Sequence, residues 1–556
     1  MWTVPVSSYD TLREIFGGEI GWQGQVPEEE RYIHNFDIDT SVSDQLKLQP
    51  YPFQWIGANF LVSVKRGILA DMMGLGKAVQ GITALLLLKK SNPDTKAVIF
   101  CLASLKYQWL SEIQRFTDLS AMVIDGTNEQ RAKLYEEYIG LQPDVVIINY
   151  ELLYRDYDAI SALVNNHCNV MIMDEAQKIK NWKSKLSSMF KGLATRNKET
   201  KRVEIVYAGL RTEYLWMLTG TPMENSPEEL FNLFAVLDSR ILGNLWAFRN
   251  RYLVLGSFKQ ILGYKNHAEL HARVAPYMLR RRREEVEAEF PEEMRSDIVL
   301  AMTPFQARAH EFVRRTIEEV MDDMIEEFDD IGENEDSNTI IGRIALLLGI
   351  ADSPELLSMS SSQVAAVTLR SLHPNKIDLA SSPKLDWIED YVRQMLADDP
   401  DSKVIIFTRS SRFQGLIVDR LSELADVTII NGAMNAKARD ESRITFVDGS
   451  TNIMVSTDAG ARGLNLQAAA TLINADVPWN PAMLEQRCGR IVRIGSRHDH
   501  VRIINLYSRG SIDERIRQVI YEKTSVFNLI VEKTNDEQRN IVRLNQALIR
   551  KLVGGR

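Results

Sequence analysis

Short, continuous apolar runs recur along this chain and constrain its fold more than any other feature. Segments with a helical pattern separate them, and strands that are apolar on both faces are typical of a parallel sheet covered by helices. The stretch from about Asn225 to Asp378 is charged, helix-like and poor in such runs. We therefore predict an α/β protein with two lobes around a helical middle. The runs lie at 67–70, 97–102, 145–149, 170–173 and 215–218, and then at 403–407, 426–430, 452–456, 471–475 and 501–506.

Size and composition are typical of a folded protein with more than one domain. The chain has 556 residues, too many for a single hydrophobic core, and 45% of them are hydrophobic. The first residues lack a basic start followed by an apolar run, so we expect no secretory signal. Apolar runs such as 84–88 are far too short for a bilayer, so we expect no membrane span. Cys101, Cys168 and Cys488 have no metal-ligating spacing. We expect a cytoplasmic protein without a zinc site.

The net charge of −9 does not exclude nucleic acid as a partner. The segment 318–336 holds 11 acidic residues and no basic one, so the rest of the chain carries +2. Such a block is typical of a solvated helix that runs into a loop, and it could also repel DNA from one surface or inhibit the protein. A local basic groove therefore remains compatible with the composition.

The run at 67–70 leads into DMMGLGKA (71–78), which has the form of a phosphate-binding loop. Gly74 and Gly76 allow backbone N–H groups to face phosphate oxygens at the start of a helix, and Lys77 can reach the β- and γ-phosphates. In the helix that follows, the apolar positions fall on one face. A glycine turn followed by a chance lysine would look similar, so the loop alone does not decide the function.

The run at 170–173 ends in two adjacent carboxylates, Asp174 and Glu175. At a strand end, one carboxylate can hold Mg²⁺, usually through water, while the next polarises the water that attacks a phosphate. A buried strand that leads into a charged helix cap would look similar. The phosphate loop and the carboxylate pair, in this order, together predict an ATP site beyond the carboxyl ends of the strands.

Three segments make the chain similar to a known family. DEAQKIKN (174–181), LTGTPMENSPEELFNLF (218–234) and DVPWNPAMLEQRCGRIVRIGS (476–496) resemble the Swi/Snf-type ATPases of helicase superfamily two. STDAGARGLNLQAA (456–469) is more like the bacterial, archaeal or phage members. The resemblance covers roughly residues 48–516. It implies two RecA-like lobes with parallel sheets and inserted helical protrusions, with ATP and Mg²⁺ bound between the lobes.

The resemblance assigns roles in the first lobe. Lys77, Asp174 and Glu175 would be catalytic, with Asp174 also holding the metal. Thr219 and Thr221 would hydrogen-bond to the carboxylate motif. The residues expected to bind the nucleotide are Gln54, Met73, Gly74, Leu75, Gly76, Lys77 and Ala78, and Gln54 would read adenine. The residues expected to contact a DNA strand are Ser104, Trp109 and Asn149.

In the second lobe, the resemblance makes Gln486, Arg490 and Arg493 catalytic. The two arginines match the family's arginine fingers, and their spacing of three would place them on one helical face, directed across a cleft at the γ-phosphate. The residues expected to bind nucleotide are Gly460 and Gly463, and those expected to contact DNA are Thr408, Asn465 and Trp479.

The expected domains follow from the resemblance. An N-terminal accessory segment (1–46) precedes lobe 1 (47–300), lobe 2 (301–530) and a C-terminal helix (531–556) that packs back on the lobes or binds DNA. The basic run 280–283 would touch DNA or act as a brake, or it is a solvated helix end paired with Glu284 and Glu285.

Several positions depart from the family pattern. Ala78 stands where a Ser or Thr hydroxyl normally ligates Mg²⁺, Met72 replaces an acid, Gln177 replaces a common histidine, and Leu102 replaces a proline. A water could fill the empty coordination place of Mg²⁺. The alternatives are an ATPase that is slow or metal-sensitive, a trap that binds ATP without turnover, and a scaffold without activity.

The predicted function is a DNA-dependent ATPase that translocates on duplex or forked DNA and remodels DNA structures or displaces bound proteins. The alternative is a nucleotide-gated module that binds DNA or RNA polymerase with little or no turnover. A strand-separating helicase would need a wedge hairpin that the sequence does not reveal. RNA polymerase or replication and repair proteins are further expected partners, and we expect a monomer.

Overall fold

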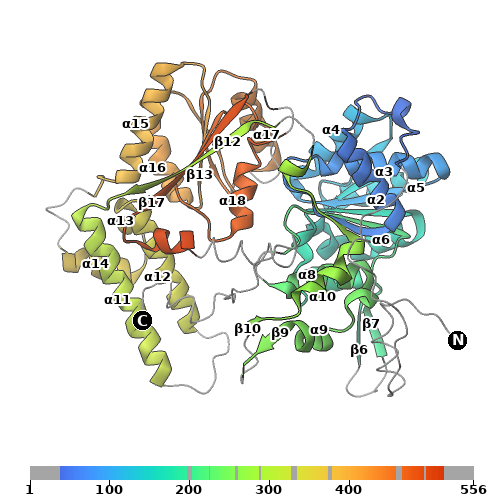
Figure 1. The fold of residues 1–556 in the computed structure, drawn as a ribbon, viewed down its shortest axis with the longest axis horizontal. Coiled ribbons are helices and arrows are strands. Elements are labelled where there is room, and N and C mark those ends of the chain that lie inside the picture. Colours follow the sequence, from blue (N-terminus) through green and yellow to red (C-terminus); the bar gives the residue numbers. More distant parts are fainter. Residues whose placement is uncertain are drawn as a thin grey trace. The chain divides into compact units, whose positions relative to one another are not determined.

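The structure is a computed structural model in which the chain forms two compact units (Figure 1). The units meet in sequence near residue 288. Gly460, Gly463, Asn465 and the C-terminal segment 531–556 lie outside the described residues, as do residues 1–37 and the middle of the acidic block. The described residues are 38–196, 203–223, 226–256, 261–286, 290–326, 335–372, 379–458, 466–493, 496 and 498–518.

The first unit contains a seven-stranded sheet in the order β11-β1-β8-β5-β2-β4-β3, and every neighbouring pair is parallel. All five apolar runs predicted for this half form strands of the sheet. Its strands are β1 (Arg66–Leu69), β2 (Ala97–Cys101), β3 (Ala121–Val123), β4 (Val145–Asn149), β5 (Val170–Asp174), β8 (Tyr214–Leu218) and β11 (Met278–Leu279).

Successive residues of these strands point to opposite faces of the sheet and enter two hydrophobic clusters. Val98 and Phe100 pack on the face covered by α5 to α10, while Ala97 and Ile99 pack on the face covered by α2 to α4. The helices are α2 (Pro52–Val64), α3 (Lys77–Ser91), α4 (Lys106–Phe116), α5 (Asn128–Leu141), α6 (Leu153–His167), α7 (Lys185–Lys191), α8 (Pro227–Leu242), α9 (Leu245–Tyr252) and α10 (His267–Val274). Residues 79–88 of α3 are all buried, so this helix is enclosed on every side and not only along the predicted apolar face.

The second unit contains a six-stranded sheet in the order β12-β17-β16-β13-β15-β14, again with all neighbours parallel. The five predicted runs of this half form β13 to β17, so the prediction of two parallel α/β sheets is confirmed. The strands are β12 (Glu292–Leu300), β13 (Val404–Thr408), β14 (Val427–Ile430), β15 (Ile453–Thr457), β16 (Thr471–Asn474) and β17 (His500–Ser508). Helices α15 (Pro383–Asp398), α16 (Ser411–Leu421), α17 (Ala436–Val447) and α18 (Pro481–Cys488) cover the faces.

The middle of the chain holds more strand than its sequence indicates. β12 pairs along its whole length with β17, so residues up to 300 that the sequence assigned to lobe 1 belong to the second sheet. Its sequence, EEMRSDIVL, is charged because its first residues lie exposed at the edge of the sheet. Two antiparallel pairs of strands also went unpredicted. β9 (Leu253–Leu255) pairs with β10 (Ile261–Tyr264) in the middle of the chain, and β6 (Leu193–Arg196) pairs with β7 (Val203–Tyr207) before it.

The predicted helical insertion of the second unit lies between β12 and β13. Its helices α11 (Pro304–Glu326), α12 (Glu335–Asp352), α13 (Glu355–Ser358) and α14 (Gln363–Leu372) share a hydrophobic cluster of their own. Ile512 and Ile516, which follow β17, complete that cluster. The insertion is therefore packed on the end of the chain segment that leaves the sheet.

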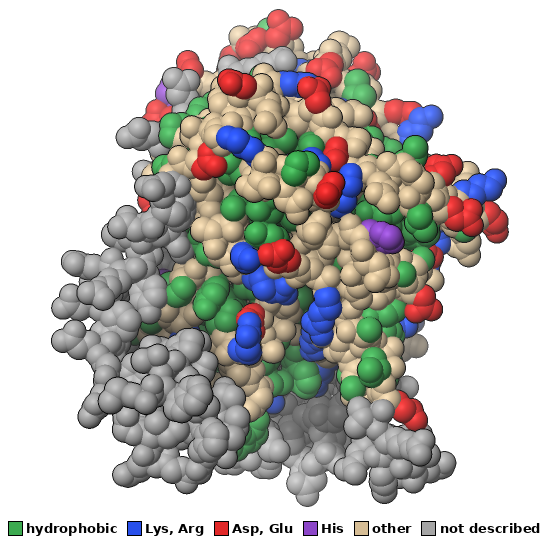
Figure 2. All heavy atoms as spheres, turned by 90° about the vertical axis from the view of Figure 1, so that its right-hand side faces the viewer, with side chains coloured by type: hydrophobic (Ala, Val, Ile, Leu, Met, Phe, Trp, Pro, Cys, Tyr) green, Lys and Arg blue, Asp and Glu red, His purple; other side chains and the backbone are tan. Residues whose placement is uncertain are grey.

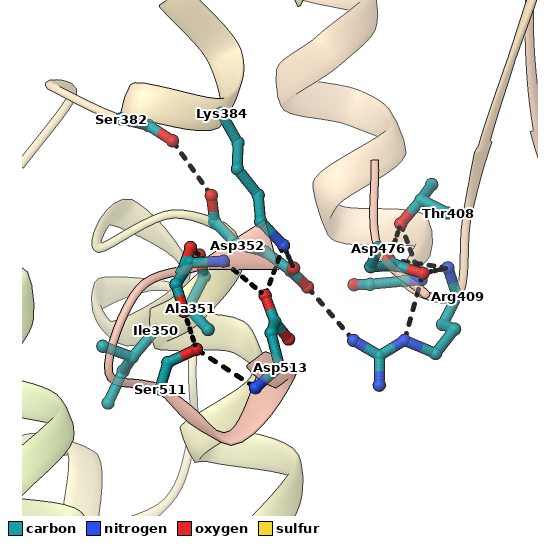
Figure 3. A network of polar contacts seen from close by, with 12 residues as sticks. Ile350, Ala351, Asp352, Ser382, Lys384, Thr408, Arg409, Asp476, Ser511 and Asp513 are labelled. Carbon is teal, nitrogen blue, oxygen red and sulfur yellow. Dashed lines mark hydrogen bonds and ion pairs between the residues drawn. The ribbon is translucent and has the colours of Figure 1, made fainter. Parts of the chain in front are cut away.

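A buried polar network joins this insertion to the second sheet (Figure 3). Lys384 donates to Asp352 over 2.8 Å and to Asp513 over 2.7 Å, and its side chain is 1% exposed. Arg409 lies 3.6 Å from Asp352 and 3.0 Å from Asp476, so it connects the two carboxylates. Buried carboxylates that share cations in this way hold α12, α15 and the strand ends together.

Charged side chains of both signs lie on one face of the first unit. On the face drawn in Figure 2, acidic side chains gather at the top and along the right edge, several basic ones lie in the lower middle, and hydrophobic side chains lie between them. Within the described ranges, no helix is both long and apolar enough to span a bilayer.

We predict that Lys384→Met destabilises the second unit. The substitution leaves Asp352 and Asp513 buried without their shared cation, which costs about 3–5 kcal/mol. Lys437→Met is the control, because Lys437 is 88% exposed and pairs with Glu441 over 3.8 Å, a contact worth less than about 1 kcal/mol. Thermal melting should show a clear fall for the first variant only, and equal melting temperatures for both would contradict the role of the network.

Candidate active site

The phosphate loop joins β1 to α3 and has the backbone shape that its glycines predict. Gly74 and Gly76 have φ values of 90° and 69°, in the left-handed region that favours glycine. A Cβ on Gly76 would lie 2.4 Å from Nε2 of Gln54, so a side chain there would also clash. Gln54 accepts from the N–H of Tyr51 over 3.0 Å and donates to the carbonyl of Leu75 over 3.2 Å. The residue expected to read adenine therefore lies directly against the loop.

A buried carboxylate, Asp71, fixes the start of the loop. Arg281 donates to its two oxygens over 3.0 and 2.5 Å, and Gln80 of α3 donates to it over 3.0 Å. Arg281 also donates to Gln80 over 2.8 Å and lies over the ring of Phe53. Because Asp71 is fully buried and carries three charge-assisted hydrogen bonds, it ties the loop to β11, α2 and α3 at once.

Arg280 braces the strand ends next to that loop. Its guanidinium donates to the carbonyl of Ala70 over 2.8 Å and to the carbonyl of Gly220 over 3.1 Å. The basic run 280–283 is thus not a solvated helix end, because Arg280 and Arg281 turn toward the phosphate loop and Arg283 is buried. This corrects the prediction of a solvated helix end, while a contact with DNA or a role as a brake stays a prediction.

Lys77 is the first residue of α3, and its ammonium lies at the centre of the site. It donates to the carbonyls of Asp71 and Met72 over 2.8 and 3.3 Å. Burial lowers the pKa of Lys77, and the nearby charges of Glu175, Asp71 and Asp174 oppose this effect. A Cβ on Gly220 would lie 3.6 Å from its Nζ, so the LTGTP segment also borders the ammonium.

Asp174 ends β5 and is held by neighbours on three sides. Trp109 of α4 donates its indole N–H to Oδ2 over 2.8 Å, the N–H of Glu175 donates to Oδ1 over 3.0 Å, and Tyr150 donates to the backbone carbonyl over 2.8 Å. Burial, together with the charge of Glu175, raises the pKa of Asp174 to about 6, and the Trp109 N–H opposes the shift.

Glu175 adopts a left-handed backbone conformation, with φ of 52°. A non-glycine residue in this region is strained by about 1–3 kcal/mol, and such strain occurs at sites where a side chain must be aimed. Its carboxylate accepts from Gln177, whose own amide oxygen accepts from Thr219 over 2.7 Å. The expected link from the LTGTP motif to the carboxylates therefore runs from Thr219 through Gln177, while Thr221 donates its N–H to Thr219 over 3.0 Å.

This donor set fits Mg²⁺ that arrives with a nucleotide. Each oxygen of Asp174 accepts one N–H in the protein, which leaves further lone pairs for a metal-bound water. Mg²⁺ in nucleotide sites is typically held by one or two carboxylates together with the phosphates. Asp174 would hold the metal, with Glu175 beside it.

Ala78 offers no polar atom to that metal. It is half-buried, and its methyl group packs against the hydrophobic cluster under α2, α3 and α4. Met73 and Leu75 complete the loop, and Leu75 is fully buried. The hydroxyl that the family pattern places after the lysine has no substitute at this position.

Two residues predicted to contact DNA have different partners. Trp109 is 3% exposed and binds Asp174, and Thr408 is fully buried and donates to Asp476 over 2.6 Å. Both predictions came from position in a motif, which does not reveal the direction of a side chain. Ser104 lies just before α4 and is half-buried. Asn149 is buried, and its side-chain amide donates to the carboxylate of Glu151 over 2.9 Å. Trp479 packs against the cluster of the helical insertion.

The catalytic residues expected in the second unit lie near the end of α18. That helix ends at Cys488, so the prediction that Arg490 and Arg493 share a helical face is wrong. They lie instead in the turns that follow it, where Arg490 is buried and donates to the carbonyl of Gln486 over 3.0 Å, and Arg493 is half-buried. Arg487 is an internal residue that binds Asp458 over 2.6 and 3.0 Å.

Sequence reasoning missed Asp71, Gln80, Arg280 and Arg281 as parts of the site. Asp71 and Gln80 flank the loop, and a buried polar pair on either side of a glycine turn is a signal that could have been read. Arg281 is separated from Asp71 by 210 residues in the sequence, and Arg280 is equally distant from the loop. No local pattern therefore connects the arginines to the loop.

Comparison with known proteins identifies the family and the fold of the chain. Residues 53–347 match the SNF2-related domain, and residues 384–495 match the helicase conserved C-terminal domain. The chain is 28% identical to the uncharacterized ATP-dependent helicase YqhH of Bacillus subtilis, over 88% of this chain and 80% of that protein. It is 25% identical to the TATA-binding protein-associated factor BTAF1 of Arabidopsis thaliana, over 92% of this chain but only 27% of that protein. The Pyrococcus furiosus Hef helicase domain shares the fold, with a TM-score of 0.50 and 14% identity over 84% of this chain and 98% of that chain.

We predict that Arg281→Gln loosens the phosphate loop. The variant leaves Asp71 buried with only Gln80 as a side-chain donor, so hydrogen–deuterium exchange of the amides in 71–80 should become faster. Arg420→Gln is the control, because Arg420 pairs with Asp386 and Glu389 on the surface. Unchanged exchange in the Arg281 variant would show that Asp71 does not depend on this arginine.

Proposed function

This chain belongs to the SNF2-related family of helicase-like proteins, and we propose that it is a DNA-dependent ATPase that translocates on duplex DNA. One observation carries the proposal. Lys77, Asp174 and Glu175 converge at the carboxyl edge of one parallel sheet, and the loop that presents the lysine is held by a buried ion pair. An ammonium beside two carboxylates at a helix start is the arrangement that binds a magnesium-bound triphosphate.

The residues of the first unit would divide the chemistry between them. The N–H groups at the start of α3 and the ammonium of Lys77 hold the phosphates, and Gln54 contacts the adenine. Asp174 would hold Mg²⁺, which would supply positive charge beside the phosphates. Glu175, aimed by its strained backbone and by Gln177, orients and polarises the attacking water.

The second unit would supply the positive charge that completes the site. We propose that Gln486, Arg490 and Arg493 approach the γ-phosphate when the two units close. A ligand that binds the closed arrangement more tightly than the open one can drive such a motion, and release of phosphate reverses it. Repeated closing would move the protein along DNA, because each unit holds a different stretch of the backbone.

The DNA contacts in this proposal are made to phosphates and not to bases. Ser104 and Asn149 of the first unit, with Asn465 and Trp479 of the second, remain the proposed contact residues. Phosphate contacts are independent of sequence and weaken as salt rises. Duplex or forked DNA is the proposed substrate, and RNA polymerase or repair proteins are proposed partners of a cytoplasmic monomer.

The test is release of phosphate from ATP by the full chain, with and without duplex DNA, across a salt series. We expect DNA to stimulate release and salt to suppress the stimulation. Glu175→Gln should lower the stimulated rate by about 10²-fold or more while nucleotide binding persists, because only the water-orienting carboxylate is lost. Absence of release from the wild type with duplex DNA would contradict the proposed motor.

Ala78 favours a second candidate, a nucleotide-gated module that binds DNA or RNA polymerase with little turnover. Its methyl group cannot ligate Mg²⁺, so a water molecule would have to take that place, while binding by the loop N–H groups and Lys77 does not require a hydroxyl. In this alternative the chain would bind ATP, close and dock without cycling.

Ala78→Thr separates the two candidates. The added hydroxyl can ligate Mg²⁺, so we expect faster DNA-stimulated phosphate release, with a lower Mg²⁺ requirement. Ala78→Val is the matched control, because it adds the same bulk without the oxygen and should not accelerate release. Equal rates in the parent chain and the Thr variant would show that the hydroxyl is dispensable here.

A further inference from the structure

Helix α4 connects a proposed DNA contact to the carboxylate proposed to hold Mg²⁺. Ser104 lies in the short helical turn η4 (Ala103–Leu105), which runs directly into α4. The residues of α4 that face the interior are Lys106, Trp109 and Ile113, spaced as one side of a helix. A displacement at Ser104 would therefore move Trp109 with it, because both belong to one continuous helical segment.

Trp109 makes the connection through a single hydrogen bond. Its indole N–H donates to Oδ2 of Asp174 over 2.8 Å, and the side chain is only 3% exposed. An indole is a donor only, and it neither ionises near neutral pH nor binds Mg²⁺. Its contribution is thus limited to the position and orientation of the carboxylate.

Lys106 anchors the first turn of α4 to the segment that follows β3. Its buried ammonium donates to the carbonyl of Ile124 over 3.2 Å and pairs with Asp125 at 2.8 Å. Tyr107 also donates to Asp125, over 3.1 Å. The beginning of α4 is anchored beside Ser104, so the helix has defined contacts at both of the places that the coupling requires.

A second proposed DNA segment reaches the same residue from another strand. Asn149 ends β4, and the next residue, Tyr150, donates its hydroxyl to the backbone carbonyl of Asp174 over 2.8 Å. Tyr150 is 1% exposed and packs against Phe100 and Phe190. Each of the two segments proposed to contact DNA therefore contributes one buried aromatic side chain that donates a hydrogen bond to Asp174.

We propose that Trp109 and Tyr150 are positioning residues that couple DNA at the segments around Ser104 and Asn149 to the magnesium-bound nucleotide at Asp174. The inference rests on the proposed function and adds the route by which DNA stimulates it. If bound DNA stabilises one position of α4 and of Tyr150, it also stabilises one position of the Asp174 carboxylate, because both are hydrogen-bonded to Asp174. Coupling of this kind is reciprocal, so the magnesium-bound nucleotide must tighten DNA binding by the same factor.

Binding of a fluorescent, non-hydrolysable ATP analogue to the full chain tests the coupling without turnover. Its affinity is measured in Mg²⁺ with and without a saturating duplex oligonucleotide, and again in EDTA. In the wild type we expect DNA to tighten the binding in Mg²⁺ by a factor of about 5–150, the range of typical coupling energies, and much less in EDTA. In Trp109→Phe the factor in Mg²⁺ should fall toward one.

The chain contains a matched control for the loss of an indole N–H. Trp216 in β8 is fully buried in the same sheet, and its N–H has no hydrogen-bond partner among the described residues. Trp216→Phe should therefore keep the wild-type factor. Tyr150→Phe removes one hydroxyl and should also lower the factor, whereas Tyr138→Phe, which loses only a contact of 3.7 Å to the sulfur of Cys168, should not.

The outcomes are distinct. A factor retained in both Trp109→Phe and Tyr150→Phe overturns the proposal, as does a wild-type factor of one or a factor that persists in full in EDTA. If Trp109→Phe fails to fold, as judged by its melting temperature, Tyr150→Phe decides. A wild type that binds no nucleotide or no DNA refutes the proposed function itself, and the coupling with it.

Discussion

The buried ion pair between Asp71 and Arg281 is the interaction on which the candidate site depends. In the parallel sheet of the first unit, the carboxyl ends of all strands lie at the same edge. The phosphate loop places Lys77 at this edge, next to the carboxylates of Asp174 and Glu175. A flexible glycine turn would not hold that position alone. Asp71 holds it, because its carboxylate accepts three hydrogen bonds from two side chains, Arg281 and Gln80. Loss of Arg281 would leave a buried charge, at a cost of about 3–5 kcal/mol.

Much of the fold follows from local pattern, and much of the site does not. Ten apolar runs predicted ten strands, since a strand buried on both faces must be continuously apolar. β12 was missed because its exposed first residues are charged, and β11 because it has only two residues. Trp109 and Thr408 were assigned to DNA from motif position, but the direction of a side chain depends on the packing around it. Arg281 could not be placed, because its partner lies 210 residues away.

The departures from the family pattern have different structural consequences. Gln177 keeps the function of a hydrogen-bonding link, because its amide joins Glu175 to Thr219. Leu102 adopts φ of −67°, the value that proline would impose, so the turn into α4 keeps its shape. Ala78 alone removes a metal ligand without a replacement. Under the proposed function, the rate of hydrolysis would therefore depend on how well a water molecule replaces the missing hydroxyl as a ligand of Mg²⁺.

The central claim is that one ATP is held by the ammonium and carboxylates of the first unit and completed by the arginines of the second. A crystal structure of the full chain with Mg²⁺ and a non-hydrolysable ATP analogue tests it most directly. The account predicts that Lys77 leaves the carbonyls of Asp71 and Met72 for the phosphates, and that Arg490 and Arg493 face the γ-phosphate. Nucleotide bound away from the loop of Lys77, or arginines directed away from it in a closed state, would contradict the account.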